Sequence, residues 1–562
     1  MKLFTYALLL TLLITQLNCA NQKTPTGGPK DSIPPALLQS FPSSGTTNFK
    51  GNTITLIFDD KIGSQQLKNT LIISPTTDLT YDITTKQNKT RLILNEPLLD
   101  STTYTFNFLD GITDLTERNP VVNLRVAFST GPYIDSLFVN GKVSDLYNQT
   151  PQAFMYVGLY PQTDSLDLLK DKPLYFSQTD SSGCYSLENI KPGHYKIFAF
   201  KDENKNFLFD PSTETYGFIS EPQILSVGLD SMNITSNSID SSPLRTLTAK
   251  PFGHYFDIRY SKPITNYNFI YLSDHTNSHY TQLINEDNTL RFYNNDTAHP
   301  PTDSVGIMVI AYDTIGQTTS DTLYLKFITS NKPTPPVNAT GSITKLTPTY
   351  VEALIIFSKP IKHFNNNLIT VYADSLLNEF PIDSLATFHW NQQMTELTLR
   401  YTIPWTTLND TLNNILQQRH NLDTLLPAST VLNKIYLSFD TTAFITVEND
   451  SVVISPLSLR RTSTEDYGTL HIKLNTFKTS FTLQLLNDKE QVVSTVLNES
   501  ETTFSYLQPG SYHLRILIDD NLDGQWGPGN LINNTQPETI VLFPSLTKVL
   551  ANWEINIDNL SF

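Results

Sequence analysis

The stretch ENIKPGHYKIFAFKDENKNFLFDP, residues 188–211, has a second copy in SYLQPGSYHLRILIDDNLDGQWGP, residues 505–528, which aligns on it without gaps. In each copy a Pro-Gly pair predicts a turn, because these residues favour the backbone angles that turns need. The residues after the turn alternate as in a β-strand, and an acidic, asparagine-rich segment follows as a loop. A strand-and-loop unit that occurs twice predicts a β-protein with repeated modules.

A second repeat is a strand that ends in a charged turn and an isoleucine. It occurs as LIFDDKI at 56–62, IRYSKPI at 258–264 and LIIFSKPI at 354–361. Proline has no N–H to donate to a neighbouring strand, so S-K-P-I marks the end or edge of a strand. Elsewhere, as at 91–112 and 304–328, short strand patterns alternate with turn signals every ~8–12 residues, which is typical of β-sandwiches.

The composition agrees with a β-protein and excludes one class of partner. Of the 562 residues only 16% are charged, against about 25% in typical globular domains. The formal net charge is −16, and no cluster of lysine and arginine interrupts it. Proteins that bind phosphate backbones need such a cluster, so we predict no nucleic-acid partner.

One helix is predicted in this chain. Asp410 can cap the segment, Leu412, Ile415 and Leu416 form an apolar stripe with helical spacing, and His420 closes it. The predicted fold is therefore all-β, with tandem β-sandwich modules and one short helical insertion that packs on its own sandwich.

The N-terminal stretch MKLFTYALLLTLLITQLNCA, residues 1–20, has the pattern of a secretory signal, because its apolar run is too short for a membrane span. Cys19 lies where that run ends. This placement resembles a bacterial lipoprotein signal, in which the cysteine thiol is lipidated and anchors the protein. The residues just before Cys19 depart from the strict pattern, so an ordinary secreted protein is the alternative. With Cys19 lipidated, Cys184 has no disulfide partner.

Several motifs resemble known bacterial modules. The S-K-P-I strands and their Pro-rich entries resemble the bacterial Ig-like domain of the surface-layer (SbsA) type. Residues 180–206, DSSGCYSLENIKPGHYKIFAFKDENKN, resemble the carboxypeptidase regulatory-like, transthyretin-like domain, whose G-x-Y-x-L…PG-x-Y pattern is matched by Gly183, Tyr185, Leu187, Pro192, Gly193 and Tyr195. The opening CANQKTPTGGPKDSIPP, residues 19–35, is similar to the tether of Gram-negative, Bacteroidota-type Ig-like lipoproteins. The resemblance implies a membrane-anchored, all-β protein of several domains and no catalytic residues.

Together the repeats and the resemblance predict seven segments. They are a lipoprotein signal peptide (1–18), a Pro/Gly tether (19–35), an Ig-like domain (36–131), a carboxypeptidase regulatory-like/transthyretin-like β-sandwich (132–241), an Ig-like domain (242–330), an Ig-like domain with the insertion (337–456) and a transthyretin-like β-sandwich (463–562).

The sequence contains no recognisable catalytic motif. H-E-x-x-H, G-x-S-x-G, G-x-G-x-x-G and the P-loop are all missing. His275 and His279 have the spacing of a helical metal site, but their segment is typical of a turn and offers no third ligand. We predict that the protein is not an enzyme and requires no cofactor. An enzyme without a recognisable motif is the less favoured alternative.

The acidic loops of the long repeat are candidate calcium sites. Their candidate ligands are Asp519, Asn521 and Asp523 in the second copy, and Asp202, Asn204, Asn206 and Asp210 in the first. The second copy begins like a calcium loop, D-x-N-x-D-G, but its twelfth position is Asn530, where the loop requires a bidentate glutamate. The alternative is a turn in which aspartate and asparagine side chains bond their own backbone.

A further pattern is Asp followed by Ser or Thr and an aliphatic residue, as at Asp135, Asp164, Asp313, Asp321, Asp374, Asp383 and Asp423. It resembles the O-glycosylation acceptor of some Gram-negative envelope proteins. The alternative is a turn residue that enters a strand, and the sequence leaves both open.

The function that these features predict is a non-enzymatic, lipid-anchored protein of the cell envelope, which acts as a structural spacer or as an adhesion or binding module. The expected location is the outer membrane, with the periplasmic and surface faces both open. The partners would be the membrane, through the N-terminal lipid, and a glycan or envelope protein. The alternative is a polysaccharide-binding lipoprotein, for which Trp526 in the second acidic loop is the candidate sugar platform.

Overall fold

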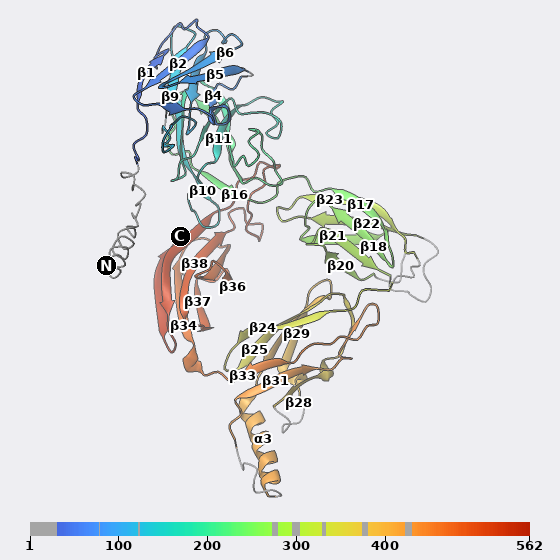
Figure 1. Ribbon diagram of the computed structural model, residues 1–562. Coiled ribbons are helices and arrows are strands. Elements are labelled where there is room, and N and C mark those ends of the chain that lie inside the picture. The colour runs from blue at the N-terminus through green and yellow to red at the C-terminus, as the bar shows by residue number, and fades with distance from the viewer. Residues whose placement is uncertain are drawn as a thin grey trace, which may run out of the picture. The chain divides into compact units, whose positions relative to one another are not determined.

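The computed structural model describes residues 31–77, 79–121, 124–272, 279–294, 304–328, 333–373, 380–421 and 430–562. It divides into two compact units, which we describe separately. The first unit comprises residues 1–144, 151–209 and 221–234, and the second comprises residues 145–150, 210–220 and 235–562. The labels below are those of Figure 1.

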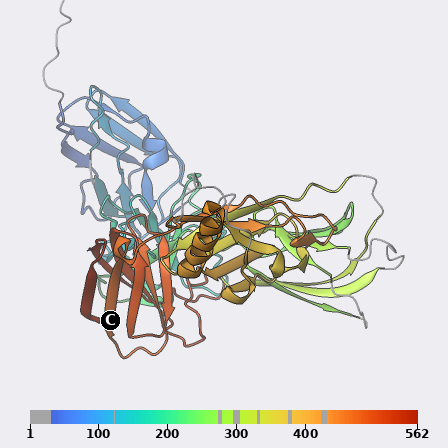
Figure 2. The ribbon, with the colours of Figure 1, turned by 90° about the horizontal axis from the view of Figure 1, so that it is seen from below.

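The first sandwich buries its core between two antiparallel sheets, drawn in blue in Figure 2. Ile54 and Leu56 from one sheet and Phe106 and Phe128 from the other belong to one apolar cluster. The first sheet has the order β1 (Leu37–Phe41), β2 (Thr53–Phe58), β6 (Lys89–Leu94), β5 (Tyr81–Lys86). The second sheet has the order β4 (Ile72–Ser74), β7 (Thr103–Asn107), β9 (Arg125–Ser129). A separate pair joins β3 (Ile62–Gly63) to β8 (Thr113–Asp114), and helix α2 spans Leu67–Thr70.

The second module contains the first copy of the long repeat. Its strands form one sheet in the order β12 (Tyr175–Gln178), β11 (Tyr156–Pro161), β14 (Gly193–Phe200), β15 (Tyr216–Leu225), β16 (Ile234–Asn237), β10 (Leu137–Asp145), β13 (Cys184–Ile190). Strand β14 is the strand that the repeat predicts, and it begins at the glycine of the Pro-Gly pair.

The third module is a two-sheet sandwich whose strand β22 alternates strictly between buried and half-buried residues, as one core-facing side requires. Its sheets are β17 (Thr246–Phe252), β18 (Tyr255–Tyr260), β21 (Thr289–Tyr293), β20 (Thr281–Ile284) and β19 (Asn266–Tyr271), β22 (Val305–Tyr312), β23 (Thr318–Leu325).

The fourth module carries helix α3. One sheet has the order β24 (Ala339–Leu346), β25 (Tyr350–Phe357), β30 (Glu396–Thr402), β29 (Ala386–Trp390). A second has the order β28 (Phe380–Pro381), β27 (Ile369–Tyr372), β31 (Lys434–Phe439), β33 (Leu457–Arg460). Strands β26 (Ile361–Phe364) and β32 (Phe444–Thr446) form a separate pair. Single 3-10 turns span Asn366–Leu368 and Asp383–Leu385.

Helix α3 spans Trp405–His420, so it ends at the predicted residue but begins five residues before Asp410. The prediction of Asp410 as the cap was wrong, because the buried stripe extends upstream through Leu408 to Trp405. Threonine and asparagine between these residues have low helix propensity and masked the first turn in the sequence. Leu412 and Leu416 are buried in the core of the same module, so the helix packs on its own sandwich as predicted.

The fifth module contains the second copy of the repeat. Its sheets are β37 (Glu501–Leu507), β34 (Gly468–Asn475), β40 (Glu554–Ser561) and β36 (Val492–Leu497), β35 (Phe481–Asn487), β38 (Gly510–Ile518), β39 (Ile540–Val549), with a 3-10 turn at Thr464–Asp466. Strands β34 and β40 run parallel, and β38 is the strand that the repeat predicts.

The all-β class with tandem sandwiches is confirmed. The S-K-P-I proline ends strands as expected, since β18 stops at Tyr260 and β25 at Phe357. The seven segment boundaries stay a prediction.

A tyrosine hydrogen bond explains why the two copies of P-G-x-Y fold alike. Tyr195 Oη donates to the Lys191 carbonyl at 2.9 Å, and Tyr512 Oη donates to the Gln508 carbonyl at 2.7 Å. The ring lies so close to the preceding turn that a Cβ on Gly193 would stand 3.1 Å from the Tyr195 ring. Each tyrosine therefore fixes the turn through which the chain enters β14 or β38.

The lysines of the two S-K-P-I motifs are buried, which the sequence did not indicate. Lys262 Nζ lies 2.6 Å from Asp313 Oδ2, with both side chains almost fully buried. Lys359 forms ion pairs with Glu448 and with Asp450, the latter at 2.6 Å. A lysine is kept charged inside a protein only by such partners. In the first copy the aligned residue is Asp60, which is exposed.

We predict that Lys359→Met lowers the free energy of unfolding of the fourth module by about 3–5 kcal/mol, because it leaves the buried Glu448 carboxylate without its cation. Urea unfolding followed by tryptophan fluorescence measures this, since Trp390 and Trp405 lie in that module.

The matched control is Lys362→Met, three residues along the chain on β26, where the side chain is exposed. The double variant Lys359→Met/Glu448→Gln removes both charges and should recover part of the loss. Equal unfolding midpoints for the two single variants would show that the buried ion pair is not needed.

Candidate functional site

The second acidic loop is closed by its own hydrogen bonds. The Asp519 carboxylate accepts from Ser480 Oγ at 2.7 Å, from Gly524 N at 2.9 Å and from Asp523 N at 3.2 Å. These bonds, led by the one from Ser480, lower the pKa of Asp519. Gly524 has a φ of +93°, a backbone angle that other residues rarely adopt. The D-x-N-x-D-G pattern thus forms a turn that satisfies its own backbone.

A second carboxylate fastens this loop from the other side. Glu538 accepts from Asn521 N at 3.0 Å and from Gly527 N at 2.7 Å. The Asn521 side chain accepts from Asp523 N at 2.8 Å. Asn530, where a calcium loop has its glutamate, is buried and accepts from Ile532 N at 2.9 Å. All of these oxygens receive N–H donors from the loop.

Within the second unit the same loop contacts segments distant in sequence. Asn237 Nδ2 donates to the Pro528 carbonyl at 3.2 Å, and Asn530 Nδ2 donates to the Ile315 carbonyl at 3.1 Å. Gln536 and Asn534 donate to the carbonyls of Phe218 and Ser220 at 2.8 and 3.0 Å. The loop is therefore an internal junction of the second unit.

Trp526 takes part in that junction. Its ring centroid lies 5.7 Å from that of Tyr147, its Nε1 donates to the Glu538 carbonyl at 3.2 Å, and its side chain is half-buried. Arg515 lies over the other aromatic partner, Tyr147, at 5.7 Å from the ring centroid. The tryptophan has a packing role in the second unit, and its sugar-binding role stays a prediction.

The first acidic loop has the same kind of turn. The Asp202 carboxylate accepts from Asn206 N at 3.1 Å and from Phe207 N at 2.9 Å, and Asn204 Oδ1 accepts from Asn206 N at 3.0 Å. Asp210 accepts from Ser212, both backbone and hydroxyl, and these bonds lower the pKa of Asp210. The described part of the chain contains no group of three or more His, Cys, Asp or Glu residues that could hold a metal ion. Calcium binding stays a prediction at both loops.

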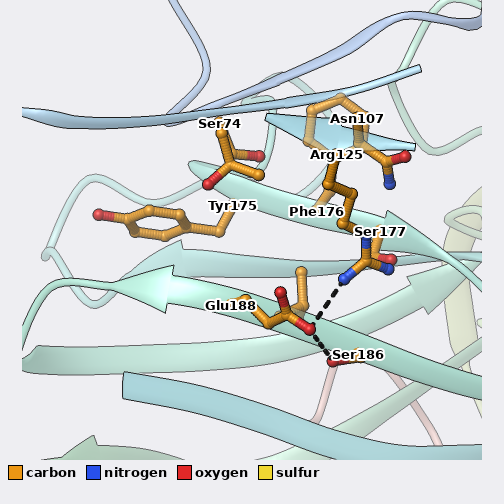
Figure 3. Close-up of a pocket in the computed structure, with 10 residues that line it drawn as sticks. Ser74, Asn107, Arg125, Tyr175, Phe176, Ser177, Ser186 and Glu188 are labelled. Atoms are coloured by element: carbon orange, nitrogen blue, oxygen red, sulfur yellow. Dashed lines mark hydrogen bonds and ion pairs between the residues drawn. The ribbon is translucent and has the colours of Figure 1, made fainter. Parts of the chain in front are cut away.

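The first unit has a small cavity where its two modules meet, shown in Figure 3. Arg125 of β9 reaches toward Glu188 of β13, with Nη1 3.1 Å from Oε1, and Ser186 also bonds to Glu188. The cavity has a volume of about 20 Å³, which is room for about one water molecule and for no larger ligand.

A larger groove, the junction groove, lies beside that cavity in the first unit and has a volume of about 510 Å³. Helix α2 and the loop after β7 form one wall, and residues 154–156, the 178–181 turn and Lys205 form the other. Lys205 belongs to the first acidic loop, so the two copies of the repeat place their loops in different surroundings. The volume is in the range of ordinary ligand sites.

Sequence reasoning missed the groove residues Phe154 and Tyr156. In the structure Phe154 stands out because 64% of its side chain is exposed to solvent. A sequence does not reveal the exposure of a single aromatic residue. Tyr156 reads in the sequence as an ordinary strand residue.

Other predicted positions fall outside the described residues, namely Cys19, His275, Asp374 and Asp423. His279 Nδ1 lies 2.8 Å from Tyr271 Oη. Asp313 is buried with Lys262, and the Asp321 carboxylate accepts from Thr246 Oγ1 at 2.5 Å. Among the described helices none is long and apolar enough to span a membrane.

The comparison with protein families identifies the first module. Residues 31–130 match the family model of the bacterial Ig-like domain, Big_5. The prediction of an Ig-like domain in this part of the chain is confirmed. No curated protein matches the chain.

Solved structures that resemble the chain include the major pilin subunit BcpA of Bacillus cereus, with 10% identity, 76% of this chain and 99% of that chain covered, and a TM-score of 0.13. The S-layer protein SbsC has 11% identity, 86% and 65% coverage, and a TM-score of 0.14. The protein SGBP-B of the Bacteroides ovatus mixed-linkage glucan utilization locus has 11% identity, 66% and 87% coverage, and a TM-score of 0.15. TM-scores this low carry no argument about function.

Asp520 shows how pH acts on the second acidic loop. Its Oδ1 lies 2.8 Å from Lys478 Nζ, and its Oδ2 accepts from Thr539 N at 3.0 Å. The hydrogen bond from Lys478, followed by those from Thr539, lowers the pKa of Asp520 to about 2. In the unfolded chain an aspartate has a pKa of about 3.9.

Because the pKa is lowered by folding, the stabilisation by Asp520 is complete above pH ~4 and is lost as the pH falls toward ~2. We expect Asp520→Asn to lower Tm most at pH 7 and progressively less as the pH falls to 2. Circular dichroism melts between pH 2 and 7 measure Tm as a function of pH for the wild type and for the variant. Asp558→Asn, at an exposed position on β40, is the control. If Tm varied with pH in parallel for the wild type and Asp520→Asn, the pH-dependent stabilisation assigned to Asp520 would be contradicted.

Proposed function

We propose that this protein is a non-enzymatic, lipid-anchored protein of the outer membrane, which serves as a structural spacer or adhesion module in the cell envelope. The observation that supports this function best is that neighbouring modules within each unit are bonded to one another directly. The match of residues 31–130 to the bacterial Ig-like domain agrees with a structural or binding role.

In the first unit the two modules are joined along strands of both. Thr76 N donates to the Leu174 carbonyl at 2.7 Å, and Asn189 Nδ2 donates to Thr105 Oγ1 at 3.0 Å. The Arg125–Glu188 ion pair joins the same two modules. Hydrogen bonds and an ion pair from several strands restrain rotation of one module on the other more than a bare linker does.

In the second unit the third and fourth modules are joined by buried groups. Tyr255 Oη donates to Glu448 Oε1 at 2.7 Å, and Glu448 is also paired with the buried Lys359. Tyr255 and Tyr293 form a buried cluster with Val447 of the fourth module. Aromatic residues are enriched at interface cores, and separating a buried ion pair from its partners is costly, so these contacts resist opening. Such interfaces suit a spacer, which must keep its length under load.

The lipid anchor is tested by Cys19→Ala. We expect the wild type to incorporate labelled palmitate and to fractionate with the outer membrane, and the variant to lose both properties, because attachment of the lipid requires the Cys19 thiol. Cys184→Ala is the matched control, since it removes the other cysteine. Palmitate incorporation that survives Cys19→Ala would contradict the anchor.

Protease treatment of intact cells, with immunoblotting for the fifth module, tests whether the protein lies on the cell-surface face or the periplasmic face of the outer membrane. Loss of the signal indicates the cell surface and favours adhesion. A signal that persists until the outer membrane is broken indicates the periplasm and favours a spacer with an envelope-protein partner.

Calcium at the acidic loops is a further part of the proposal. An ion bound only by the folded protein raises Tm by mass action. We expect a higher Tm in millimolar calcium than in chelator, and we expect Asp523→Asn, which alters only the second loop, to reduce the difference. Identical melts of the wild type in both buffers would contradict calcium binding.

Polysaccharide binding is the second candidate function, and the junction groove favours it over the remaining alternative, an enzyme. The groove offers hydrogen-bonding side chains and an exposed aromatic ring.

A further inference from the structure

We propose that the junction groove of the first unit binds a neutral oligosaccharide, with Phe154 and Tyr156 as contact residues. This site is separate from Trp526, and the inference rests on the second candidate function.

The walls of the groove carry amide and hydroxyl groups from both modules. Gln66, Asn69 and Thr70 of helix α2 and its approach line one side, and Gln178 and Ser181 line the other. An amide both donates and accepts hydrogen bonds, and so does a hydroxyl. A sugar hydroxyl has the same dual character, so each of these side chains can pair with it in either direction.

The charged groups of the groove cancel one another. Two are acidic, Asp110 and Asp180, and two are basic, Arg125 and Lys205. Arg125 is paired with Glu188, and Asp180 accepts three hydrogen bonds within its own turn. A groove without net charge has no field to concentrate an anion or a cation. The ligand that fits is therefore neutral.

Phe154 is presented to solvent by a fixed backbone. Its N–H donates to the Thr179 carbonyl at 3.1 Å, and its carbonyl accepts from Gln178 Nε2 at 3.3 Å. Its φ is +61°, which is uncommon for a residue with a side chain and persists only where the surroundings enforce it. The exposed ring can stack on the apolar C–H face of a sugar without a cost of ordering the loop.

Tyr156 supplies the second observation. Its side chain is about 9% exposed and packs against Phe207, with ring centroids 5.4 Å apart. No hydrogen bond within the described part of the chain uses its hydroxyl. Burial, and then the nearby charges of Asp202 and Asp110, raises the pKa of Tyr156 to about 12, so the hydroxyl stays protonated. The hydroxyl is open to solvent at the groove, where it can donate a hydrogen bond to a ligand or accept one from it.

The test uses the folded, soluble domains without the lipid and a panel of neutral polysaccharides: a mixed-linkage β-glucan, dextran, xylan and galactomannan. Polygalacturonate is the anionic comparison. Affinity gel electrophoresis identifies the polysaccharide, and calorimetry with its oligosaccharide gives Kd. We expect binding to at least one neutral member.

Two variants test the site itself. Tyr156→Phe removes only the hydroxyl and should weaken binding about 3- to 10-fold, the effect of one hydrogen bond. Phe154→Ala removes the exposed ring and should weaken binding at least tenfold. Phe477→Ala, which removes a fully exposed ring in the fifth module, is the matched control and should leave Kd unchanged. Circular dichroism melts confirm that each variant is folded.

The outcomes distinguish a failure of the groove proposal from a failure of the glycan-binding function. If Trp526→Ala abolishes binding while Phe154→Ala and Tyr156→Phe do not, the groove proposal fails and glycan binding stands. If no neutral polysaccharide binds, both fail and the spacer function is unaffected. Binding of polygalacturonate alone overturns the neutral ligand class.

Discussion

The loops that join the strands of this protein are held in shape by aspartate and asparagine side chains that accept backbone N–H groups. Asp114 alone accepts from the N–H groups of residues 116, 117, 118 and 119, at 2.7–3.1 Å. A sandwich buries one face of each strand and leaves its loops in water, where they would otherwise be mobile. Because the carboxylates close the loops, the loops can serve as rigid contact surfaces.

The two copies of the long repeat use this rigidity in different ways. The Asp519 loop makes bonds to residues 218, 220, 237 and 315 and holds parts of the second unit together. The Asp202 loop instead contributes Lys205 to an open groove. The same turn chemistry therefore supports an internal junction in one copy and a solvent-facing wall in the other. This difference would allow the proposed spacer role and the proposed binding role to coexist in one chain.

The strands could be predicted from the sequence because a half-buried strand has a period of two residues. Strand β22 follows this period throughout, and β38 follows it from Leu514 onward. The start of α3 could not be predicted, because burial of Trp405 and Leu408 in the core outweighed the low helix propensity of their neighbours. The burial of Lys262 depends on Asp313, and that of Lys359 on Glu448. Both partners lie in turns distant in the sequence, which no local pattern reveals. The groove is invisible to sequence reasoning for the same reason, since two modules form its walls.

The bond from each P-G-x-Y tyrosine to the carbonyl four residues upstream lies at the start of its strand, while the acidic loop follows the strand's far end. The turn is thus secured without any contribution from the loop. Substitutions in the loop leave that anchor intact. Natural selection can then alter one loop while the duplicated framework is retained, so this β-sandwich is a tolerant starting point for new specificities.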